Sequence, residues 1–359
     1  MNSRIAADPL IEAVLDEHPI VAFSVLGGKD SAAATVATND YLDARGHPRA
    51  RRVLIHADLG AIEWRSTPEQ VASLAKRTGL ELIIARRQAG GLIERWQQRF
   101  ANGKARYTKL ETYNLIGPWS SSALRFCTSE MKAQVIGPEL RRRYAGQTIV
   151  SVVGLRRAES ASRAQASVAA IDARFAKPGN AAGTRMLTWH PIIEWSDAEV
   201  FAFHEERGLA LHEAYWRWDA TRMGCTYCVL ASLRNLAASA RAPDNHEVFR
   251  QLVDIEIAST FSFQSARWLG DVAPELLEGK RSHLLNQAKH AAELRRSHEA
   301  SLPADLRFQK GWPPRLPTTS EAARIAEVRA RILGHHGLPN LYPRAGDIIG
   351  RFTELRQAA

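Results

Sequence analysis

The amino-acid sequence predicts an α/β protein with a doubly wound parallel sheet and a helical C-terminal extension. Short apolar runs alternate with stretches of helical pattern along the first part of the chain. The expected strands are residues 20–25, 53–58, 81–86, 148–153 and 186–193. Strands that alternate with helices form parallel sheets, and ligands bind outside the carboxyl ends of such strands. The 359 residues, 45% of them hydrophobic, suffice for a substantial core in one or two domains.

The first expected strand leads into a glycine turn, residues 27–31 (Gly-Gly-Lys-Asp-Ser), and then into an alanine-rich helical pattern. This order points backbone N–H groups and a helix N-terminus at an anion such as phosphate. Gly27 and Gly28 have no Cβ, so the backbone can curl closely around the anion. Lys29 adds a positive charge, and Ser31 adds a hydroxyl for a phosphate oxygen or its Mg²⁺ ion. The alternative is an ordinary strand-to-helix turn with an Asp or Ser cap; the Walker A spacing is absent.

This turn resembles the S-G-G-x-D-S loop of the PP-loop ATP pyrophosphatases and of their relatives, the sulfonucleotide (PAPS and APS) reductases. The resemblance implies an adenine nucleotide alpha hydrolase-like fold that binds ATP with its phosphates on residues 27–31. It also implies catalytic roles for Lys29 and Asp30. The departure is Leu26, which stands where the family has its first serine, so one phosphate hydroxyl is missing.

A second motif, G-x-R-x-x-E-S-x-x-R, follows the strand expected at residues 148–153. Its residues are Gly154, Arg156, Glu159, Ser160 and Arg163. The spacing is similar to the second phosphate motif of the same family, which implies that Gly154, Glu159 and Ser160 help to bind the nucleotide. Arg156 and Arg163 would neutralise charge that develops on an α-phosphate as pyrophosphate leaves. The alternative is a solvated basic helix face.

Asp58 ends the second expected strand, which in the family lies beside the nucleotide. The resemblance implies that Asp58 orients adenosine or Mg²⁺. The alternative for Asp58 is a helix cap near Pro68.

The chain has three cysteines, Cys127, Cys225 and Cys228, and the last two form a C-x-x-C. We see no secretory signal at the start of the sequence and no apolar run long enough to span a bilayer. We therefore expect a cytoplasmic protein that does not bind a membrane. In reducing cytosol such cysteines more often bind metal or do chemistry than form a structural disulfide.

The surroundings of the cysteines are similar to those in iron-sulfur APS reductases. Cys127 with Lys132 resembles the first cluster element, in which Phe126 replaces one of two paired cysteines. The R-x-G-C-x-x-C that ends at Cys228 resembles the second. The resemblance implies a [4Fe-4S] cluster on Cys127, Cys225 and Cys228. The alternatives are Zn²⁺ held by these cysteines with His212, and three buried cysteines without metal.

One absence separates branches of the family. Sulfonucleotide reductases attack the sulfate with a cysteine near the C-terminus, and no cysteine follows Cys228 here. We therefore do not expect a conventional PAPS or APS reductase.

The composition favours a polyanionic partner. Lys and Arg number 48 against 38 Asp and Glu, which gives a net charge of +10. Arginine clusters lie at residues 49–52, 86–87, 141–143 and 295–296. They are candidates for phosphate contacts, and the alternative for each is a solvated surface.

We expect a PP-loop nucleotide-binding catalytic domain at residues 1–236 and a helical region at residues 237–359. Helical patterns cover residues 245–261 and 273–299, and Thr318-Thr319-Ser320-Glu321 predicts a capping-box start for a helix to about Leu333.

The expected function is ATP-dependent sulfur insertion into a nucleic acid, similar to DNA phosphorothioation or tRNA thiolation. The implied cofactors are ATP, Mg²⁺ and the [4Fe-4S] cluster, and the implied partners are DNA or tRNA and a cysteine desulfurase or other sulfur donor. The alternatives are a sulfonucleotide reductase-like enzyme of sulfur assimilation and a non-catalytic nucleotide-sensing regulator.

Overall fold

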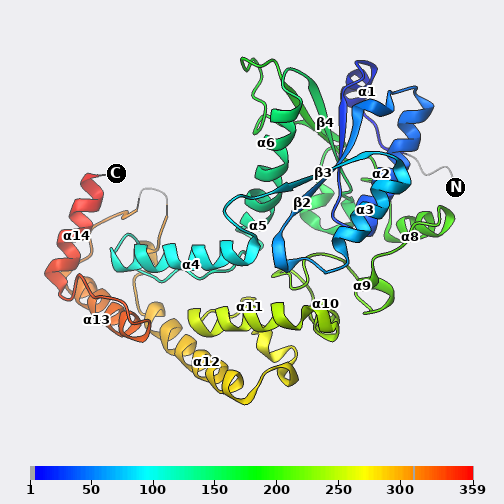
Figure 1. Cartoon of the computed structure of the whole chain (residues 1–359). Helices are drawn as coiled ribbons and strands as arrows, with labels where there is room; N and C mark the ends of the chain where they lie inside the picture. Colours follow the sequence, from blue (N-terminus) through cyan, green and yellow to red (C-terminus); the bar gives the residue numbers. More distant parts are fainter. Residues whose placement is uncertain (1–4, 310–311, 359) are drawn as a thin grey trace. The chain divides into compact units, whose positions relative to one another are not determined.

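The chain divides into two compact units in the computed structural model, which describes residues 5–309 and 312–358 (Figure 1). The first unit comprises residues 1–92 and 123–245, and the second comprises residues 93–122 and 246–359. These ranges differ from the expected domains 1–236 and 237–359. Residues 93–122 share a hydrophobic core with the C-terminal helices, so the second unit is discontinuous in the sequence.

The first unit is built on a six-stranded sheet with the strand order β3-β2-β1-β4-β6-β5. The strands are β1 (Ile20–Ser24), β2 (Arg52–Asp58), β3 (Glu81–Arg86), β4 (Thr148–Val153), β5 (Ala169–Ile171) and β6 (Arg185–Trp189). All neighbouring strands run parallel except β5, a short antiparallel edge strand that the sequence analysis did not predict. The predicted doubly wound sheet is confirmed, and its five expected strands correspond to β1 to β4 and β6.

Helices cover both faces of this sheet (Figure 1). The helices of the first unit are α1 (Pro9–Asp16), α2 (Lys29–Ala44), α3 (Thr67–Thr78), α5 (Phe126–Thr128), α6 (Gln134–Arg143), α7 (Ala161–Ala164), α8 (Asp197–Glu206), α9 (Glu213–Trp216) and α10 (Leu233–Arg241). Alternate residues of a strand point to opposite faces. Val21 and Phe23 therefore join the core with α1, α2, α3 and α8, whereas Ile20 and Ala22 join the core that contains Leu140 of α6.

The sheet has one topological switch point, between β1 and β4. From β1 the chain continues to β2 on one side of the sheet, and it returns later to form β4 on the other side. Adjacent loops diverge at such a point, and in open α/β sheets the resulting crevice at the carboxyl ends binds ligands. The loops that leave β1 and β4 are the two predicted phosphate motifs.

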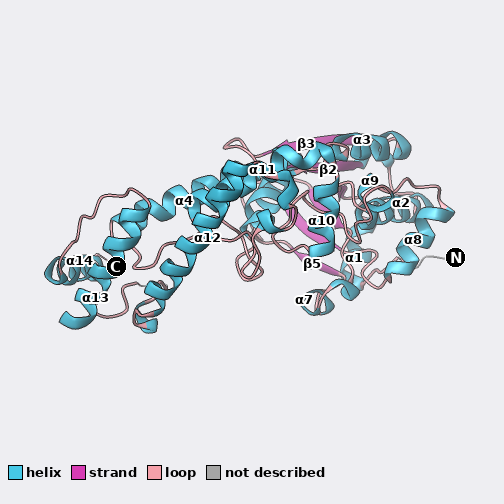
Figure 2. Cartoon of the chain, turned by 90° about the horizontal axis from the view of Figure 1, so that it is seen from below, coloured by secondary structure: helices cyan, strands magenta, loops and turns pink. Residues whose placement is uncertain are grey.

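The second unit is helical (Figure 2). Its helices are α4 (Leu92–Thr108), α11 (His246–Ser259), α12 (Gly279–Ala300), α13 (Thr319–His335) and α14 (Ala345–Gln357). The capping box at the start of α13 is confirmed, because Thr318 Oγ1 accepts a hydrogen bond from the Glu321 backbone N–H at 3.2 Å. The sequence analysis predicted α11, α12 and α13 but missed α4 and α14.

A buried carboxylate organises one loop of the second unit. Glu256 of α11 is fully buried and accepts three backbone N–H groups. Phe263 and Leu269 donate to Oε1, both at 2.7 Å, and Gly270 donates to Oε2 at 3.1 Å. Burial raises the pKa of Glu256 to about 7 despite these hydrogen bonds. The Glu256 side chain thus fixes residues 260–270 against α11.

Among the residues that the structure describes, every helix is too short or too polar to cross a lipid bilayer.

Candidate active site

The glycine turn after β1 has the backbone geometry that its sequence predicts. Gly27 adopts a φ of +76°, a left-handed conformation that residues with a side chain rarely adopt. Gly28 is the N-cap of α2, and no side chain caps this helix end. Ser31 Oγ donates a hydrogen bond to the Gly28 carbonyl at 2.9 Å. The turn therefore delivers the positive end of α2 to the carboxyl edge of the sheet.

Side chains from residues 212–223 cover this turn. A Cβ placed on Gly27 would lie 3.4 Å from Met223 Cε and 3.6 Å from the His212 ring, and Gly27 itself is buried. Tyr215 Oη accepts a hydrogen bond from the Met223 backbone N–H at 3.1 Å and another from the backbone of Lys29. The tyrosine oxygen thus lies where an anion oxygen would bind at the start of α2. Met223 and Tyr215 were not among the predicted site residues.

Four charged groups form a closed network beside the turn. Lys29 Nζ lies 2.6 Å from Asp197 Oδ1 and 3.2 Å from Asp30 Oδ1. Arg156 Nε lies 2.6 Å from Asp30 Oδ1, and Arg156 Nη2 lies 2.7 Å from Asp197 Oδ1. The side chains of Lys29 and Arg156 are only 4% and 5% exposed. We call this set of two cations and two anions the four-charge network.

Asp197, the first residue of α8, is a member of this network that sequence reasoning missed. Burial alone would raise the pKa of Asp197, but the hydrogen bonds and charges of Lys29 and Arg156 hold it below its usual value. Asp197 was missed because it belongs to neither phosphate motif. Its only signal in the sequence is its place in the first turn of a helix after Ser196, the N-cap.

Gly154, the first residue of the second motif, is required for close packing. A Cβ on Gly154 would lie 2.5 Å from the Asp30 carbonyl oxygen and 2.8 Å from the Ser31 nitrogen. Distances this short are not tolerated between such atoms. The end of β4 therefore lies directly on the first turn of α2, and this contact brings the Arg156 side chain to Asp30.

The remaining residues of the second motif form local turns, and Arg222 approaches them from another segment. The Ser160 side chain caps α7 by accepting from the Arg163 backbone N–H at 3.4 Å. Glu159 accepts from the Arg156 backbone N–H at 3.1 Å and from the Arg163 guanidinium. Arg222 Nη2 lies 3.6 Å from the other Glu159 oxygen, and its side chain is 58% exposed. Arg222 is therefore the more accessible of the two cations that pair with Glu159, since the Arg163 side chain is 24% exposed.

Asp58 lies at the carboxyl end of β2 and already has two partners. Its Oδ1 accepts from the Gly60 backbone N–H at 2.7 Å, and its Oδ2 accepts from Arg86 Nε at 2.9 Å. Burial would raise the pKa of Asp58, but these hydrogen bonds outweigh it and lower the pKa. The cap near Pro68 is not formed by Asp58, because the N-cap of α3 is Ser66.

The three cysteines are free thiols. Burial raises the pKa of the Cys225 thiol to about 12, while the Lys132 charge lowers it and the nearby thiols of Cys228 and Cys127 raise it further. Cys225 therefore lies within electrostatic range of Lys132 and of the other two thiols, so the two predicted cysteine elements lie near each other.

The structure gives no support to the predicted metal centre. Within residues 5–309 and 312–358, no group of three or more His, Cys, Asp or Glu side chains is arranged to hold a metal ion. His212, the fourth ligand in the zinc alternative, uses both ring nitrogens: Nδ1 accepts from the Ala214 backbone N–H, and Nε2 lies 3.1 Å from Ser66 Oγ.

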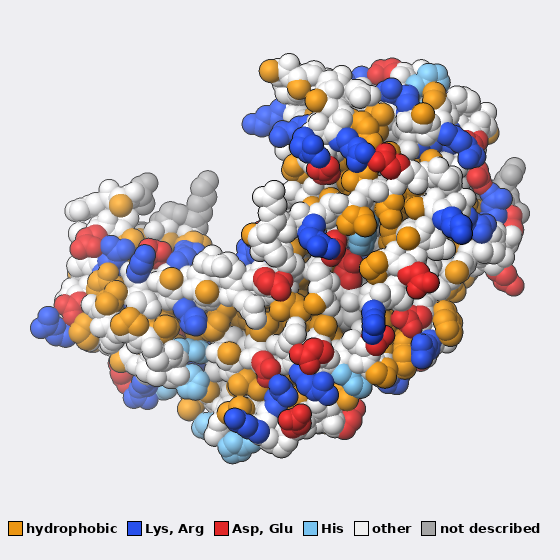
Figure 3. Space-filling view, viewed as in Figure 1, with side chains coloured by type: hydrophobic (Ala, Val, Ile, Leu, Met, Phe, Trp, Pro, Cys, Tyr) orange, Lys and Arg blue, Asp and Glu red, His pale blue; other side chains and the backbone are white. Residues whose placement is uncertain are grey.

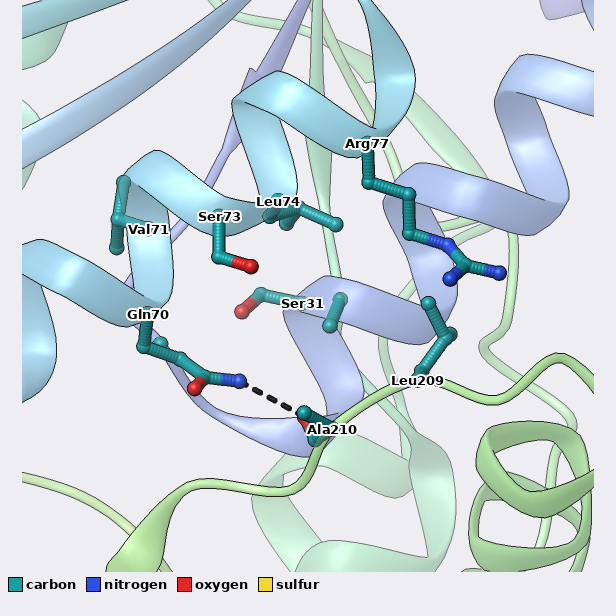
Figure 4. Close-up of a pocket in the computed structure, with 10 residues that line it drawn as sticks. Ser31, Gln70, Val71, Ser73, Leu74, Arg77, Leu209 and Ala210 are labelled. Atoms are coloured by element: carbon teal, nitrogen blue, oxygen red, sulfur yellow. Dashed lines mark hydrogen bonds between the residues drawn. The ribbon is translucent and has the colours of Figure 1, made fainter.

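A small hollow lies behind the glycine turn, between α2, α3 and residues 209–210 (Figure 4). Gln70 Nε2 closes one side of it by donating to the Ala210 carbonyl at 2.8 Å. Its volume of about 40 Å³ holds a water molecule and is far too small for a nucleotide.

Most residues of the predicted arginine clusters have acidic or carbonyl partners. Arg52 is buried and lies 2.7 Å from Asp43, and Arg295 lies 2.8 Å from Glu299. On the face shown in Figure 3, Lys and Arg side chains are interspersed with Asp and Glu. The structure thus favours the alternative interpretation, solvated or paired surface, for these clusters.

The three sequence stretches that carry the predicted site meet in space. Residues 27–31 contact the second motif through Gly154 and the Arg156–Asp30 ion pair. Residues 222–228 contact the glycine turn through Met223 and the second motif through Arg222. The convergence is a property of the first unit alone.

Comparison with known proteins agrees with this arrangement. The model of the phosphoadenosine phosphosulfate reductase domain family matches residues 18–231, which is more than half of the chain. None of the curated proteins matches the sequence.

Similar solved structures include phosphoadenylyl-sulfate (PAPS) reductase from Candida auris in a phosphate complex. It has 14% identity and a TM-score of 0.33, over 57% of this chain and 80% of that one. FMN adenylyltransferase from Candida glabrata, in complex with FAD and inorganic pyrophosphate, has 14% identity and a TM-score of 0.35, over 62% of this chain and 68% of that one. The same enzyme with FMN and the ATP analogue AMPCPP gives a TM-score of 0.33 at 14% identity, with 62% and 68% of the two chains covered.

Proposed function

Because the chain belongs to the phosphoadenosine phosphosulfate reductase domain family, we propose that it is a PP-loop enzyme that uses ATP to activate a nucleic acid for sulfur insertion. The observation that carries this proposal is the convergence of the glycine turn, the second motif and residues 222–228 at the switch point of the sheet. Ligands of doubly wound sheets bind at this place. The cations there, Lys29, Arg156, Arg163 and Arg222, are suited to phosphate oxygens.

The four-charge network determines how ATP would bind. Lys29 and Arg156 are nearly buried and are neutralised by Asp30 and Asp197, so a phosphate group has to take over their bonds from these carboxylates. Tyr215 has to leave the start of α2 at the same time. Phosphate carries more charge than the tyrosine hydroxyl, and a helix N-terminus with two cations stabilises it better.

The proposed reaction has two steps. An oxygen of the nucleic acid attacks the α-phosphorus of ATP, the bond to the β-phosphate oxygen breaks, and pyrophosphate leaves. A sulfide equivalent from a partner donor then attacks the activated position, and AMP leaves with the original oxygen. Arg156 would stabilise the charge that develops on the α-phosphate oxygens, since preorganised cations act most strongly in a site shielded from water.

Metal ions have a restricted role in this proposal. Mg²⁺ would arrive as the counter-ion of ATP. Asp30 gives up Lys29 and Arg156 to the phosphate and would then be available to this ion, whereas Asp58 keeps its partners Gly60 and Arg86. No step is assigned to an iron-sulfur cluster or to zinc, because the cysteines do not form a metal-holding group. The iron and sulfide content of anaerobically purified protein tests the predicted cluster directly.

A sulfonucleotide reductase-like activity is the second candidate. The match to the phosphoadenosine phosphosulfate reductase domain favours it, since such a domain provides a site for an adenine nucleotide that carries sulfate. The reducing thiol would then come from a partner protein.

The deciding experiment measures pyrophosphate release from ATP with and without DNA or tRNA. We expect release that depends on nucleic acid, and a loss of about 100-fold in Arg156→Lys, because lysine cannot replace the bidentate guanidinium. Arg157→Lys is the matched control, since Arg157 pairs with Glu194 outside the four-charge network.

Three results would separate the candidates. Nucleic-acid-dependent pyrophosphate release supports the proposal. No release from ATP, together with reduction of PAPS by an external thiol, contradicts it and establishes the second candidate. Tight binding of ATP without either reaction contradicts both and indicates a nucleotide sensor.

A further inference from the structure

A second pocket lies in the first unit, outside the four-charge network. Its volume is about 120 Å³, and all of its lining residues belong to residues 64–65, 213–218 and 242–245. Two tryptophans, Trp64 and Trp218, line it and join the same hydrophobic cluster as Ala242. We call it the Trp64–Trp218 pocket. Neither phosphate motif contributes to it, so the proposed ATP site does not explain it.

The rim of the pocket carries two arginines that are weakly held. Arg65 Nη1 lies 3.2 Å from Asp244 Oδ1, and the Arg65 side chain is 80% exposed. Arg217 Nη1 lies 3.6 Å from Glu213 Oε2, and the Arg217 side chain is 58% exposed. Exposed ion pairs of this kind contribute little to stability. Both guanidinium groups are therefore free to exchange their carboxylates for phosphate oxygens.

The Trp218 ring offers a flat face on which another planar group stacks. The Arg217 guanidinium carbon lies 4.9 Å from the centroid of the Trp218 ring, so the cation occupies this aromatic face and leaves it to a base when Arg217 turns to a phosphate. Tryptophan and arginine planes are the surfaces on which proteins stack nucleobases. Glu213 and Asp244 add carboxylates at the edge, and carboxylates accept hydrogen bonds from exocyclic amino groups of bases.

Two packed rings, Trp64 and His212, connect the pocket to the glycine turn. The His212 ring packs against Trp64 with 5.8 Å between centroids, and its other side faces Gly27 at 3.6 Å from a Cβ position. Ser66 links the two places, because its hydroxyl contacts His212 Nε2 and donates to Glu213 Oε1 at 2.6 Å. A group in the pocket would thus be close to phosphates on the turn.

We propose that the Trp64–Trp218 pocket receives one nucleobase of the nucleic-acid substrate, and that Arg65 and Arg217 bind the adjacent phosphates. The inference rests on the proposed function in its choice of substrate class. The volume suits a single base rather than a whole nucleotide, since pockets for larger ligands start near about 300 Å³. The carboxylates at the edge favour adenine or cytosine, which carry amino groups, over thymine or uracil, which do not.

The test measures binding of short single-stranded oligonucleotides to the full chain by tryptophan fluorescence and by a labelled-strand titration. Trp218→Ala should weaken binding about tenfold, the usual effect of removing one stacking platform, and Trp218→Phe should restore most of it. Trp216→Ala is the matched control, because Trp216 is the last residue of α9, two positions before Trp218, is 70% exposed and does not line the pocket. Oligo-dA should bind more tightly than oligo-dT.

The outcomes distinguish the pocket from the proposed function. Equal weakening in Trp216→Ala and Trp218→Ala would overturn the pocket, while nucleic-acid-dependent pyrophosphate release would still stand. Quenching of Trp218 by ATP alone, without a response to oligonucleotides, would overturn the assignment to the substrate base. If neither DNA nor RNA oligonucleotides bind the wild-type chain, both the pocket and the nucleic-acid substrate are wrong.

Discussion

Two side chains occupy the hydrogen bonds that the proposed site would give to a phosphate. Asp197 takes the hydrogen bond that Lys29 Nζ would give to a phosphate, and Tyr215 takes the one that the Lys29 backbone would give. Burial raises the pKa of Tyr215 to about 12, so its hydroxyl stays neutral at physiological pH. A neutral group is a weaker partner for a helix N-terminus than an anion is. These contacts therefore favour exchange rather than permanent closure.

Replacing Tyr215 with phenylalanine should tighten nucleotide binding. The variant keeps the ring, which packs against Phe201 at 6.1 Å, but removes the oxygen that competes with phosphate. A hydrogen bond of this kind is worth about 1 kcal/mol, so the Kd for ATP should fall about fivefold in a calorimetric titration. Tyr41→Phe, a tyrosine bonded to Glu12, is the control. Weaker binding in Tyr215→Phe would mean that the hydroxyl contacts the nucleotide itself.

His212 makes the stability of the first unit depend on pH. Burial lowers the pKa of His212 to about 4, well below the ordinary value of 6.5. Between these values the unfolded chain binds a proton that the folded chain does not, so the free energy of unfolding falls as pH falls from about 6.5 to about 4. From about pH 7 to about pH 5 the loss from this group approaches about 2 kcal/mol.

Urea unfolding of His212→Asn at the two pH values checks this prediction. Asparagine preserves the N-cap of α9 through its side-chain oxygen but does not titrate. The difference in stability between about pH 7 and about pH 5 should therefore be smaller in the variant than in the wild type. If the loss of stability between the two pH values is the same in both proteins, a group other than His212 causes the pH dependence.

At the scale of elements, the contact between the end of β4 and the start of α2 defines the site. The sequence analysis predicted Gly154 as a nucleotide-binding residue. The structure shows a steric requirement for glycine at this position. No side chain fits between β4 and the Asp30 carbonyl. The position of Arg156 next to Asp30 follows from this approach.

Gly154→Ala should therefore disturb catalysis and stability together. Its methyl group would have to push the first turn of α2 away from β4, because the obstructing atoms are backbone atoms. Overpacking of this kind costs about 1–3 kcal/mol. We expect the Gly154→Ala protein to unfold at a lower temperature than the wild type. Its rate of pyrophosphate release should also be lower than that of the wild type, as in Arg156→Lys. Gly279→Ala, at the first residue of α12 with open space around its Cβ and no left-handed φ, controls for the glycine change itself.

The sequence predicted the elements better than it predicted the contacts between them. Apolar runs and a glycine turn were sufficient for β1, β2, β4 and α2, because their patterns are local. Asp197, Tyr215 and Met223 were missed because each reaches the glycine turn from a distant segment, and no spacing in the sequence records that approach. The edge strand β5 was missed because three residues carry too little pattern.

At the scale of the molecule, the chain leaves the first unit and returns to it. Residues 93–122 contribute Phe100 and Tyr107 to a core that they share with Ile325 and Phe352 of the C-terminal helices. Arg329, fully buried, donates to the Tyr107 carbonyl at 2.6 Å and so joins α13 to the end of α4. A cut near residue 236 would therefore separate parts of one core.

The net charge of +10 predicts a salt dependence for nucleic-acid binding. The cations assigned to the proposed site and to the Trp64–Trp218 pocket are Arg65, Arg163, Arg217 and Arg222, and each would exchange a carboxylate partner for a phosphate. Four phosphate contacts on a single strand give a slope of about −3 in a plot of log K against log salt concentration. Titrations at several salt concentrations measure this slope, and a value near zero would exclude these arginines as phosphate contacts.

The discontinuous second unit has a consequence for how the protein is made. The ribosome synthesises α4 long before α11 to α14. The apolar surface of α4 therefore stays without its core partners until about half of the chain has been added. During that interval the first unit folds while residues 93–122, which are inserted in it, have not yet formed their core. Chaperone capture of the ribosome-bound chain should peak between synthesis of α4 and synthesis of α13.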